Sequence, residues 1–246
     1  MFTHHKLKVY RKALECASSA ERLSSGWPKK HSFVDHFCRA SESIVLNIAE
    51  GGRLLCGPAK LMTLDYAIGS ALECAACLDI AGVKNLLRGP EASAEKRRLW
   101  EITRMLIGLR KSWCANAMRE EPTPCQPPYG SAPDPEPLFH HETLDVYRVA
   151  LQFMRWLSSL PGAEELSDRT YRQLDKAATS LLLNIAEGNG RYSELDHRRF
   201  LDVAAASAVK SAAYLDLCEQ KSSPAGMDLS SGRGLLGRVT AMFSNF

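Results

Sequence analysis

Apolar residues recur at intervals of three and four along most of the chain, the spacing that places them on one face of an α-helix. The segment from His5 to Leu23 has this pattern and stops at a Gly-Trp-Pro sequence beginning at Gly26. The segment from Thr143 to about Ser159 repeats the pattern and stops at Pro161. Because glycine and proline disfavour helix continuation, each segment is predicted to be one amphipathic helix.

The chain contains the same module twice. The six residues Leu-Asn-Ile-Ala-Glu-Gly occur at 46–51 and again at 183–188, so the second copy lies 137 positions after the first. The same offset relates Val9-Tyr10-Arg11 to Val146-Tyr147-Arg148, and Leu78-Asp79 to Leu215-Asp216. A constant offset over this span indicates a duplicated module rather than a chance repeat of six residues.

Each hexamer ends a predicted second helix. One stripe of that helix is apolar, and a neighbouring stripe is small or polar, with Ala40, Ser43 and Asn47 in copy one and Ala177, Ser180 and Asn184 in copy two. Gly51 and Gly188 come next, where a left-handed glycine is expected to end the helix. Ser167 is expected to cap the start of this helix in copy two.

Third and fourth helices follow in each copy. In copy one, Pro58 is suited to the first position of the third helix, and Gly82 is expected to end that helix. In copy two, Ser193 with Asp196 resembles a capping box at the start of the third helix. The fourth helix of copy one, from Ala94 to about Met118, has the spacing of a bundle seam. Its counterpart is short and contains three glycines, Gly232, Gly234 and Gly237.

Residues 120–137 hold seven of the twelve prolines, which predicts an extended linker rather than a packed element. No convincing strand pattern occurs. We therefore predict an all-α protein with two tandem antiparallel four-helix bundles, residues 1–118 and 140–246, joined by a proline-rich linker over 119–139. Whether the bundles pack on each other or hang apart on the linker stays open.

Composition is that of an ordinary soluble protein, with 45% hydrophobic and 24% charged residues among 246. The net charge of +3 and the pI near 8.4 permit nucleic-acid binding without indicating it. No apolar run is long enough for a membrane helix, and the polar N-terminus does not look like a signal peptide. The eight cysteines are accordingly expected to be reduced thiols, in a cytoplasmic protein.

Three motifs together resemble one known family. They are Leu/Val-Tyr-x-x-Ala in the first helix, small-x-x-Ser-x-x-x-Asn-Ile-Ala-Glu-Gly in the second and Gly-Ser-x-x-Glu in the third. This combination looks like the bacterial four-helix-bundle proteins also called 23S ribosomal RNA intervening-sequence proteins. Those are similar to the accessory variability determinants of diversity-generating retroelements. The resemblance implies an all-α bundle without known catalysis; relatives form homopentamers, and the retroelement members bind nucleic acid and a reverse transcriptase.

Each copy departs from the family pattern in a different place. Copy two keeps Gly-x-Gly-Arg after the motif, ending at Arg191, whereas copy one reads Gly51-Gly52-Arg53-Leu54. Copy one keeps Gly69, Ser70 and Glu73 in the third helix, whereas copy two has Ala206, Ser207 and Lys210. A tandem chain also cannot supply five bundles in whole molecules, so we expect either a different assembly or one bundle outside the ring.

The motif residues have two interpretations. Asn47, Glu50, Gly51, Asn184, Glu187 and Gly188 either recognise a partner or fix how helices meet, and we favour the structural role because buried polar groups must be paired. Two arginine clusters could contact an anion or nucleic acid, or could be solvated helix surface. They comprise Arg191, Arg198 and Arg199 in copy two, and Arg97, Arg98 and Arg104 in copy one.

No pattern indicates chemistry. Cys74 and Cys77 lack the second pair of a zinc site, and the paired histidines His4-His5 and His140-His141 are expected to be surface residues. We expect no catalytic residue, metal, cofactor, membrane segment or small-molecule substrate. The preferred hypothesis is a non-enzymatic helical scaffold or adaptor that self-associates or docks a protein. The alternative is a nucleic-acid-binding accessory protein that uses the arginine clusters.

Overall fold

The computed structural model describes residues 3–54, 57–117, 137–160, 168–222 and 229–244. In these ranges the chain forms α-helices and two short 3-10 helices, and no strand. The 3-10 helices are η1 (Thr3–Lys6) and η2 (His140–Thr143). The α-helices are α1 (Lys8–Ser24), α2 (Ser32–Arg53), α3 (Pro58–Val83), α4 (Gly89–Ala117), α5 (Asp145–Ser158), α6 (Asp168–Gly188), α7 (Glu194–Ser222) and α8 (Ser230–Phe243).

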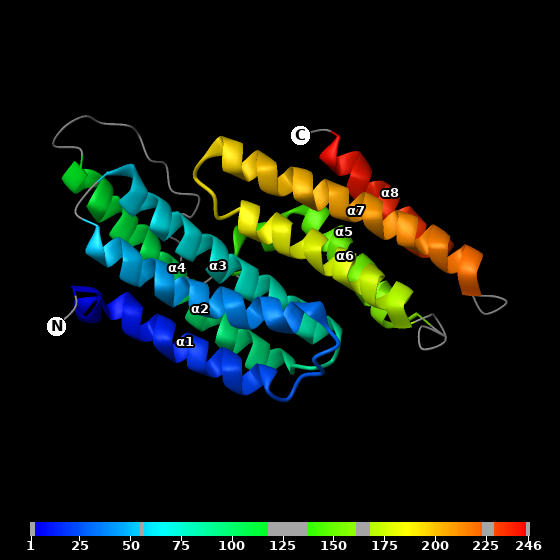
Figure 1. The fold of residues 1–246 in the computed structure, drawn as a ribbon, viewed down its shortest axis with the longest axis horizontal. Helices are drawn as coiled ribbons and strands as arrows, with labels where there is room; N and C mark the ends of the chain where they lie inside the picture. The colour runs from blue at the N-terminus through cyan, green and yellow to red at the C-terminus, as the bar shows by residue number, and fades with distance from the viewer. Residues whose placement is uncertain (1–2, 55–56, 118–136, 161–167, 223–228, 245–246) are drawn as a thin grey trace.

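Each copy closes into its own four-helix bundle. In copy one α1 packs on α2, α2 on α3, α3 on α4 and α4 back on α1. Copy two repeats this cycle with α5, α6, α7 and α8. Successive helices are antiparallel neighbours, as their short connections require (Figure 1). The all-α fold and the two tandem units predicted from the spacing are therefore confirmed.

The two bundles pack on each other, which answers the question that the sequence left open. Figure 1 places α3 of copy one beside α6 of copy two, and α3 also contacts α5. A smaller contact joins α2 to α6. One continuous set of buried apolar side chains runs through both bundles. We call this contact the inter-bundle junction.

The central helix α3 is buried on nearly all sides. Of the described helices it alone has the length and hydropathy of a membrane span, but 72% of its most apolar window is buried inside the protein. Small residues such as Gly69, Ala71 and Ala75 let neighbouring helices approach it closely. The apolar composition of α3 is thus explained by contact with both its own bundle and copy two.

Several predicted helix ends need correction. Helix α2 continues through Gly51 to Arg53, and α3 continues through Gly82 to Val83. Among the described residues the only glycine with a positive φ is Gly57, so neither Gly51 nor Gly188 is a left-handed cap. After α3 it is Asn85 that adopts a positive φ, of 56°. Packing rather than backbone conformation therefore explains the two motif glycines.

Other boundaries agree with the prediction. Pro58 is in the first turn of α3, and the Ser193 hydroxyl accepts a hydrogen bond from the Asp196 N–H at 3.3 Å at the start of α7. Helix α4 is an exception, since it begins at Gly89, five residues earlier than expected. The proline-rich linker was predicted over 119–139, and residues 119–136 of it lie outside the described residues, as does the cap at Ser167. At its end Leu138 and Phe139 are buried in the core, so these two positions are packed and are not extended linker.

Candidate functional site: the inter-bundle junction

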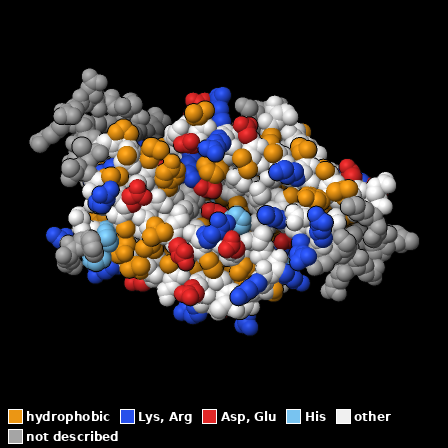
Figure 2. All heavy atoms as spheres, viewed as in Figure 1, with side chains coloured by type: hydrophobic (Ala, Val, Ile, Leu, Met, Phe, Trp, Pro, Cys, Tyr) orange, Lys and Arg blue, Asp and Glu red, His pale blue; other side chains and the backbone are white. Residues whose placement is uncertain are grey.

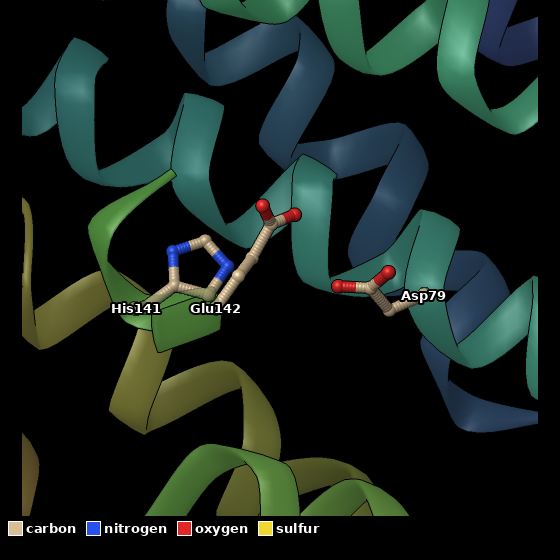
Figure 3. A group of neighbouring side chains, drawn as sticks. All are labelled: Asp79, His141 and Glu142. Carbon is tan, nitrogen blue, oxygen red and sulfur yellow. The ribbon is translucent and has the colours of Figure 1, made fainter. Parts of the chain in front are cut away.

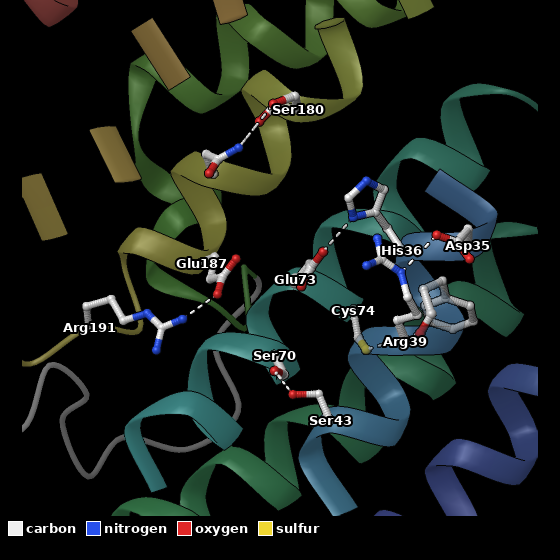
Figure 4. A network of polar contacts seen from close by, with 12 residues as sticks. Asp35, His36, Arg39, Ser43, Ser70, Glu73, Cys74, Ser180, Glu187 and Arg191 are labelled. Carbon is white, nitrogen blue, oxygen red and sulfur yellow. Dashed lines mark hydrogen bonds and ion pairs between the residues drawn. The ribbon is translucent and has the colours of Figure 1, made fainter. Parts of the chain in front are cut away.

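Both copies use the motif asparagine in the same way. The Asn47 Nδ2 donates to the Ser43 carbonyl at 2.8 Å and to its hydroxyl at 3.0 Å; Asn184 makes the same two contacts with Ser180 at 2.7 and 3.2 Å. The serine then reaches the third helix. Its hydroxyl lies 2.8 Å from the Ser70 hydroxyl in copy one (Figure 4). In copy two the Ser180 hydroxyl lies 2.9 Å from the Ser207 hydroxyl. The asparagine therefore orders the serine pair that joins the second and third helices of each bundle.

The motif glycine is required by the same helix pair. A Cβ on Gly51 would lie 2.3 Å from the Thr63 Oγ1, and one on Gly188 would lie 2.9 Å from the Phe200 Cβ. Thr63 and Phe200 are equivalent positions of the third helices, 137 residues apart. Glycine therefore allows the end of the second helix to touch the start of the third in both copies.

The motif glutamates differ between the copies. Glu50 is exposed on α2, whereas Glu187 is half-buried at the inter-bundle junction, where it bonds the Arg191 guanidinium (Figure 4). Burial raises the pKa of Glu187, and the nearby charge of Glu73 raises it further, while Arg191 opposes both effects. The Glu73 Oε1 lies 3.0 Å from the His36 Nδ1. The same motif residue thus has a junction role only in copy two.

Arg191, for which the sequence left an anion contact or solvated helix surface open, is buried at the junction. Its side chain is only 6% exposed, and its guanidinium carbon lies 4.9 Å from the Tyr66 ring and 4.7 Å from the Phe200 ring. The preceding turn approaches α3 at a glycine pair: a Cβ on Gly190 would lie 3.0 Å from the Gly69 Cα. The family residues retained by copy two therefore bind those retained by copy one.

Two ion pairs buried in the junction were not foreseen from the sequence. Lys84 at the end of α3 donates to Asp175 of α6 at 2.5 Å, and both side chains are 4% exposed. Arg110 of α4 bonds Asp65 at 2.6 Å and lies 3.7 Å from the Tyr192 ring. The position of Asp175 is occupied by Cys38 in copy one. A charge present in only one copy was therefore the feature of the sequence that could have indicated this ion pair.

A group of titratable side chains lies where α3, α4 and η2 meet. It includes Asp79, His141 and Glu142, which Figure 3 draws together. Their possible ligand atoms all lie within 4.8 Å of one another. However, the Lys96 Nζ lies 2.5 Å from a carboxylate oxygen of both Asp79 and Glu142, and Tyr147 donates to Asp79 at 2.9 Å. The Lys96 ammonium thus occupies the place that a cation would take, which explains the group as an ion-pair network.

His141 is fully buried in this group, which corrects our expectation of a surface histidine. Its ring stacks on Phe139 and meets the Tyr147 ring edge-on at a centroid distance of 4.8 Å. Neither ring nitrogen has a hydrogen-bond partner in the described structure. Burial, and then the charge of Lys96, lower the pKa of His141 to about 3, so the ring is neutral at physiological pH.

A cleft of about 1170 Å³ opens beside these pairs, between the end of α3 and the facing ends of α5 and α6. Its lining is rich in cationic side chains balanced in part by Asp79 and Asp175. The cationic residues are Lys30, Lys84, Lys96, Arg155 and Arg172. Sequence reasoning missed this cleft because its residues come from four separate helices and the connections between them.

The other predicted arginines lie on the surface. Arg97, Arg98 and Arg104 are exposed on α4, and Arg198 and Arg199 are exposed on α7. Arg98 pairs with Glu95 at 3.1 Å and Arg198 pairs with Glu194 at 2.7 Å. On the face shown in Figure 2, basic and acidic side chains are interspersed with apolar ones. Of these five, Arg97 lines a pocket of about 380 Å³ at the junction, together with Lys96, Glu142 and Tyr147.

Cys74 and Cys77 are both fully buried on α3. Burial raises the pKa of each thiol well above its ordinary value, and each is a free cysteine. They are packed as small core residues, which is the interpretation favoured from their spacing.

These features define a class, a duplicated four-helix-bundle protein whose repeated motif fixes helix packing. Comparison with protein families gives the same result: the family model described as 23S rRNA-intervening sequence protein matches residues 5–108 and again residues 142–243. The chain belongs to the 23S rRNA-intervening sequence protein family, in tandem duplicate. No curated protein and no solved structure gave a match.

Proposed function

We propose that this protein is a non-enzymatic helical scaffold of the cytoplasm, acting by self-association or by docking another protein on its bundle faces. One observation carries the proposal: large apolar side chains are exposed along one face of a single helix, α7. They are Val203, Val209 and Leu217, at 43%, 59% and 39% exposure. Soluble proteins expose aligned apolar side chains mainly where another protein binds.

The titratable groups of the junction support this proposal. Asp79, Lys96 and Glu142 neutralise one another, and Lys84 neutralises Asp175. A general acid or base needs a polar group free to exchange a proton with a substrate. The described polar clusters act instead as links between helices of different bundles, which suits a rigid connector.

Light scattering of the purified chain over a range of concentrations tests the proposal. Self-association predicts a mass that rises above the monomer value of 27.2 kDa as the protein is concentrated. A mass that stays at 27.2 kDa, together with failure to bind any protein from the same cell, would contradict it.

A second function, nucleic-acid binding, is favoured by one observation, the cationic cleft between the bundles. Lys96 of its lining is followed directly along α4 by the exposed Arg97 and Arg98. Its test is binding of single-stranded and double-stranded RNA and DNA at several salt concentrations. Binding through phosphates must weaken steeply as salt rises. Affinity that is absent, or that is indifferent to salt, would eliminate this alternative.

A further inference from the structure

The contact between the bundles is asymmetric. It joins the third helix of copy one, α3, to the second and first helices of copy two, α6 and α5. The reverse contact, of α7 with α2 and α1, is not among the helix contacts of the described residues. An asymmetric contact between two similar modules uses one face of each and leaves one face of each unused.

The unused face of copy two lies on α7. Its residues are the equivalents of the α3 residues that copy two covers, 137 positions earlier. Leu72 and Ile80 of α3 are fully buried, whereas their equivalents Val209 and Leu217 are exposed. We call this exposed set the α7 stripe: Val203, Ala206, Val209, Lys210, Ala213 and Leu217.

The unused face of copy one lies on α2. On α6, Asp175 pairs with Lys84 directly after α3, and Glu187 is close enough to Glu73 of α3 to feel its charge. At helical spacing Thr179 and Leu183 share that side of α6. Leu183 is 3% exposed, whereas its equivalent Leu46 is 66% exposed. The matching residues Glu42, Leu46 and Glu50, all exposed, form what we call the α2 stripe.

The side chains that would meet across these two stripes are complementary. In the internal junction Glu73 lies close to Glu187, and the two carboxylates repel each other. Lys210 is the counterpart of Glu73 and Glu50 is the counterpart of Glu187, so the equivalent pair between chains attracts. Arg191 lies over the Tyr66 ring, and the counterparts of these two residues are Leu54 and Val203, both apolar. Each substituted pair retains a favourable contact, although the chemistry differs from that inside the chain.

We propose that the α7 stripe binds the α2 stripe of a second copy of this chain, so that chains join head to tail. This inference rests on the proposed function and specifies its partner and surface. A second copy is the occupant because both complementary stripes are present on the same chain. The glycine pair Gly69 and Gly190 is replaced by Ala206 and Arg53, so the contact between chains is wider than the internal one at this point. It is therefore weaker and reversible.

Two blocked variants and their mixture test the pairing by light scattering. Val209→Glu disables the α7 stripe, and Leu46→Glu disables the α2 stripe; both side chains are exposed, so each variant should fold. Each alone is expected to stay at the monomer mass at concentrations where the natural chain associates. Their equimolar mixture should form a one-to-one complex of twice that mass, because each supplies the stripe that the other lacks. Met62→Glu, at 45% exposure on α3, is the matched control and should associate normally.

Three results would overturn the inference in distinguishable ways. A natural chain that never associates removes the proposed self-association together with this inference. If Leu46→Glu still associates while Val209→Glu does not, α7 pairs with itself and only the head-to-tail pairing is wrong. If both variants associate like the natural chain, another surface is used.

Charge reversal provides an independent test of the Lys210 and Glu50 contact. Lys210→Glu and Glu50→Lys should each weaken association by about tenfold, since each places like charges together. The double variant should restore association to within about threefold of the natural chain. A double variant as weak as the sum of the two single effects would contradict direct pairing of these residues.

Discussion

Gly190 in the turn after α6 touches the backbone of Gly69 on α3, so closely that a Cβ on Gly190 would lie 3.0 Å from the Gly69 Cα. The two glycines come from different copies of the duplicated module. Each belongs to a motif that only its own copy retains, Gly-x-Gly-Arg in copy two and Gly-Ser-x-x-Glu in copy one. The complementary losses in the two copies are therefore explained by one asymmetric contact that uses each motif once.

We predict that Gly190→Ala loosens the inter-bundle junction. The added methyl group must push α3 and the turn apart, and overpacking of this kind costs about 1–3 kcal/mol. Urea unfolding measures the change. Gly108→Ala is the control, because a Cβ there meets nothing within 4 Å and alanine favours a helix over glycine. Equal stability of the two variants would contradict the close approach.

Gly51→Ala should destabilise copy one from within. Its Cβ would lie 2.3 Å from the Thr63 Oγ1, so the ends of α2 and α3 would have to separate. Adding Thr63→Ala removes the obstructing atom and should recover part of the loss. The midpoints of thermal unfolding of the single and double variants decide the point. No recovery in the double variant would show that the glycine serves some other purpose.

Asp175→Asn should cost about 3 kcal/mol at pH 7, because it leaves the buried Lys84 ammonium without its charge partner. Burial raises the pKa of Asp175, but the His31 hydrogen bond and the Lys84 charge outweigh burial and lower it overall. The stabilisation is therefore fully present above the ordinary value of 3.8 and is lost as pH falls through the lowered folded-state value.

Urea unfolding of Asp175→Asn and the natural chain from pH 7 down to pH 2.5 measures this effect. The difference in unfolding free energy between them should shrink at the acid end. The double change Asp175→Leu with Lys84→Met serves as a control, since apolar replacement of both partners of a buried pair is often tolerated. A difference that stays constant down to pH 2.5 would contradict the account.

His141 makes the protein sensitive to acid at a higher pH than the Asp175 pair does. Its pKa is about 3 in the folded protein against 6.5 when exposed, so below pH 6.5 only the unfolded chain takes up the proton. Folding should lose up to about 1.4 kcal/mol per pH unit between pH 6.5 and 3 from this group. The variant His141→Phe keeps the ring stacking but has no group to protonate. Its unfolding free energy minus that of the natural chain should therefore be larger at pH 5 than at pH 7.5. Parallel stability curves would show that His141 is protonated in the folded state.

The local architecture could be predicted from the sequence because it depends on spacing within each helix. The steps of three and four gave the helices, and the constant offset between the hexamers gave the two copies. Gly51 and Gly188 were misinterpreted as helix caps, because a glycine needed for helix contact and one needed for a left-handed turn look alike in a sequence. Which of these applies depends on Thr63 and Phe200, which belong to the following helix.

The junction could not be predicted because identical residues have different surroundings in the two copies. Glu50 and Glu187 occupy the same motif position, yet one is exposed and the other is half-buried. Arg191 looked like a surface residue beside His197 and Arg198, but it lies under Tyr66 and Phe200. Only the differences between copies pointed to the contact, such as Asp175 opposite Cys38 in the alignment.

The central claim is that the two bundles form one body through the junction, and thiol protection in rising urea tests it most directly. Cys77 on α3 and Cys218 on α7 are buried and report on copies one and two in the natural chain. Brief alkylation followed by peptide mass spectrometry should find that both thiols become reactive at the same urea concentration. Exposure of Cys218 at a lower urea concentration, while Cys77 stays protected, would show two independent bundles and contradict the claim.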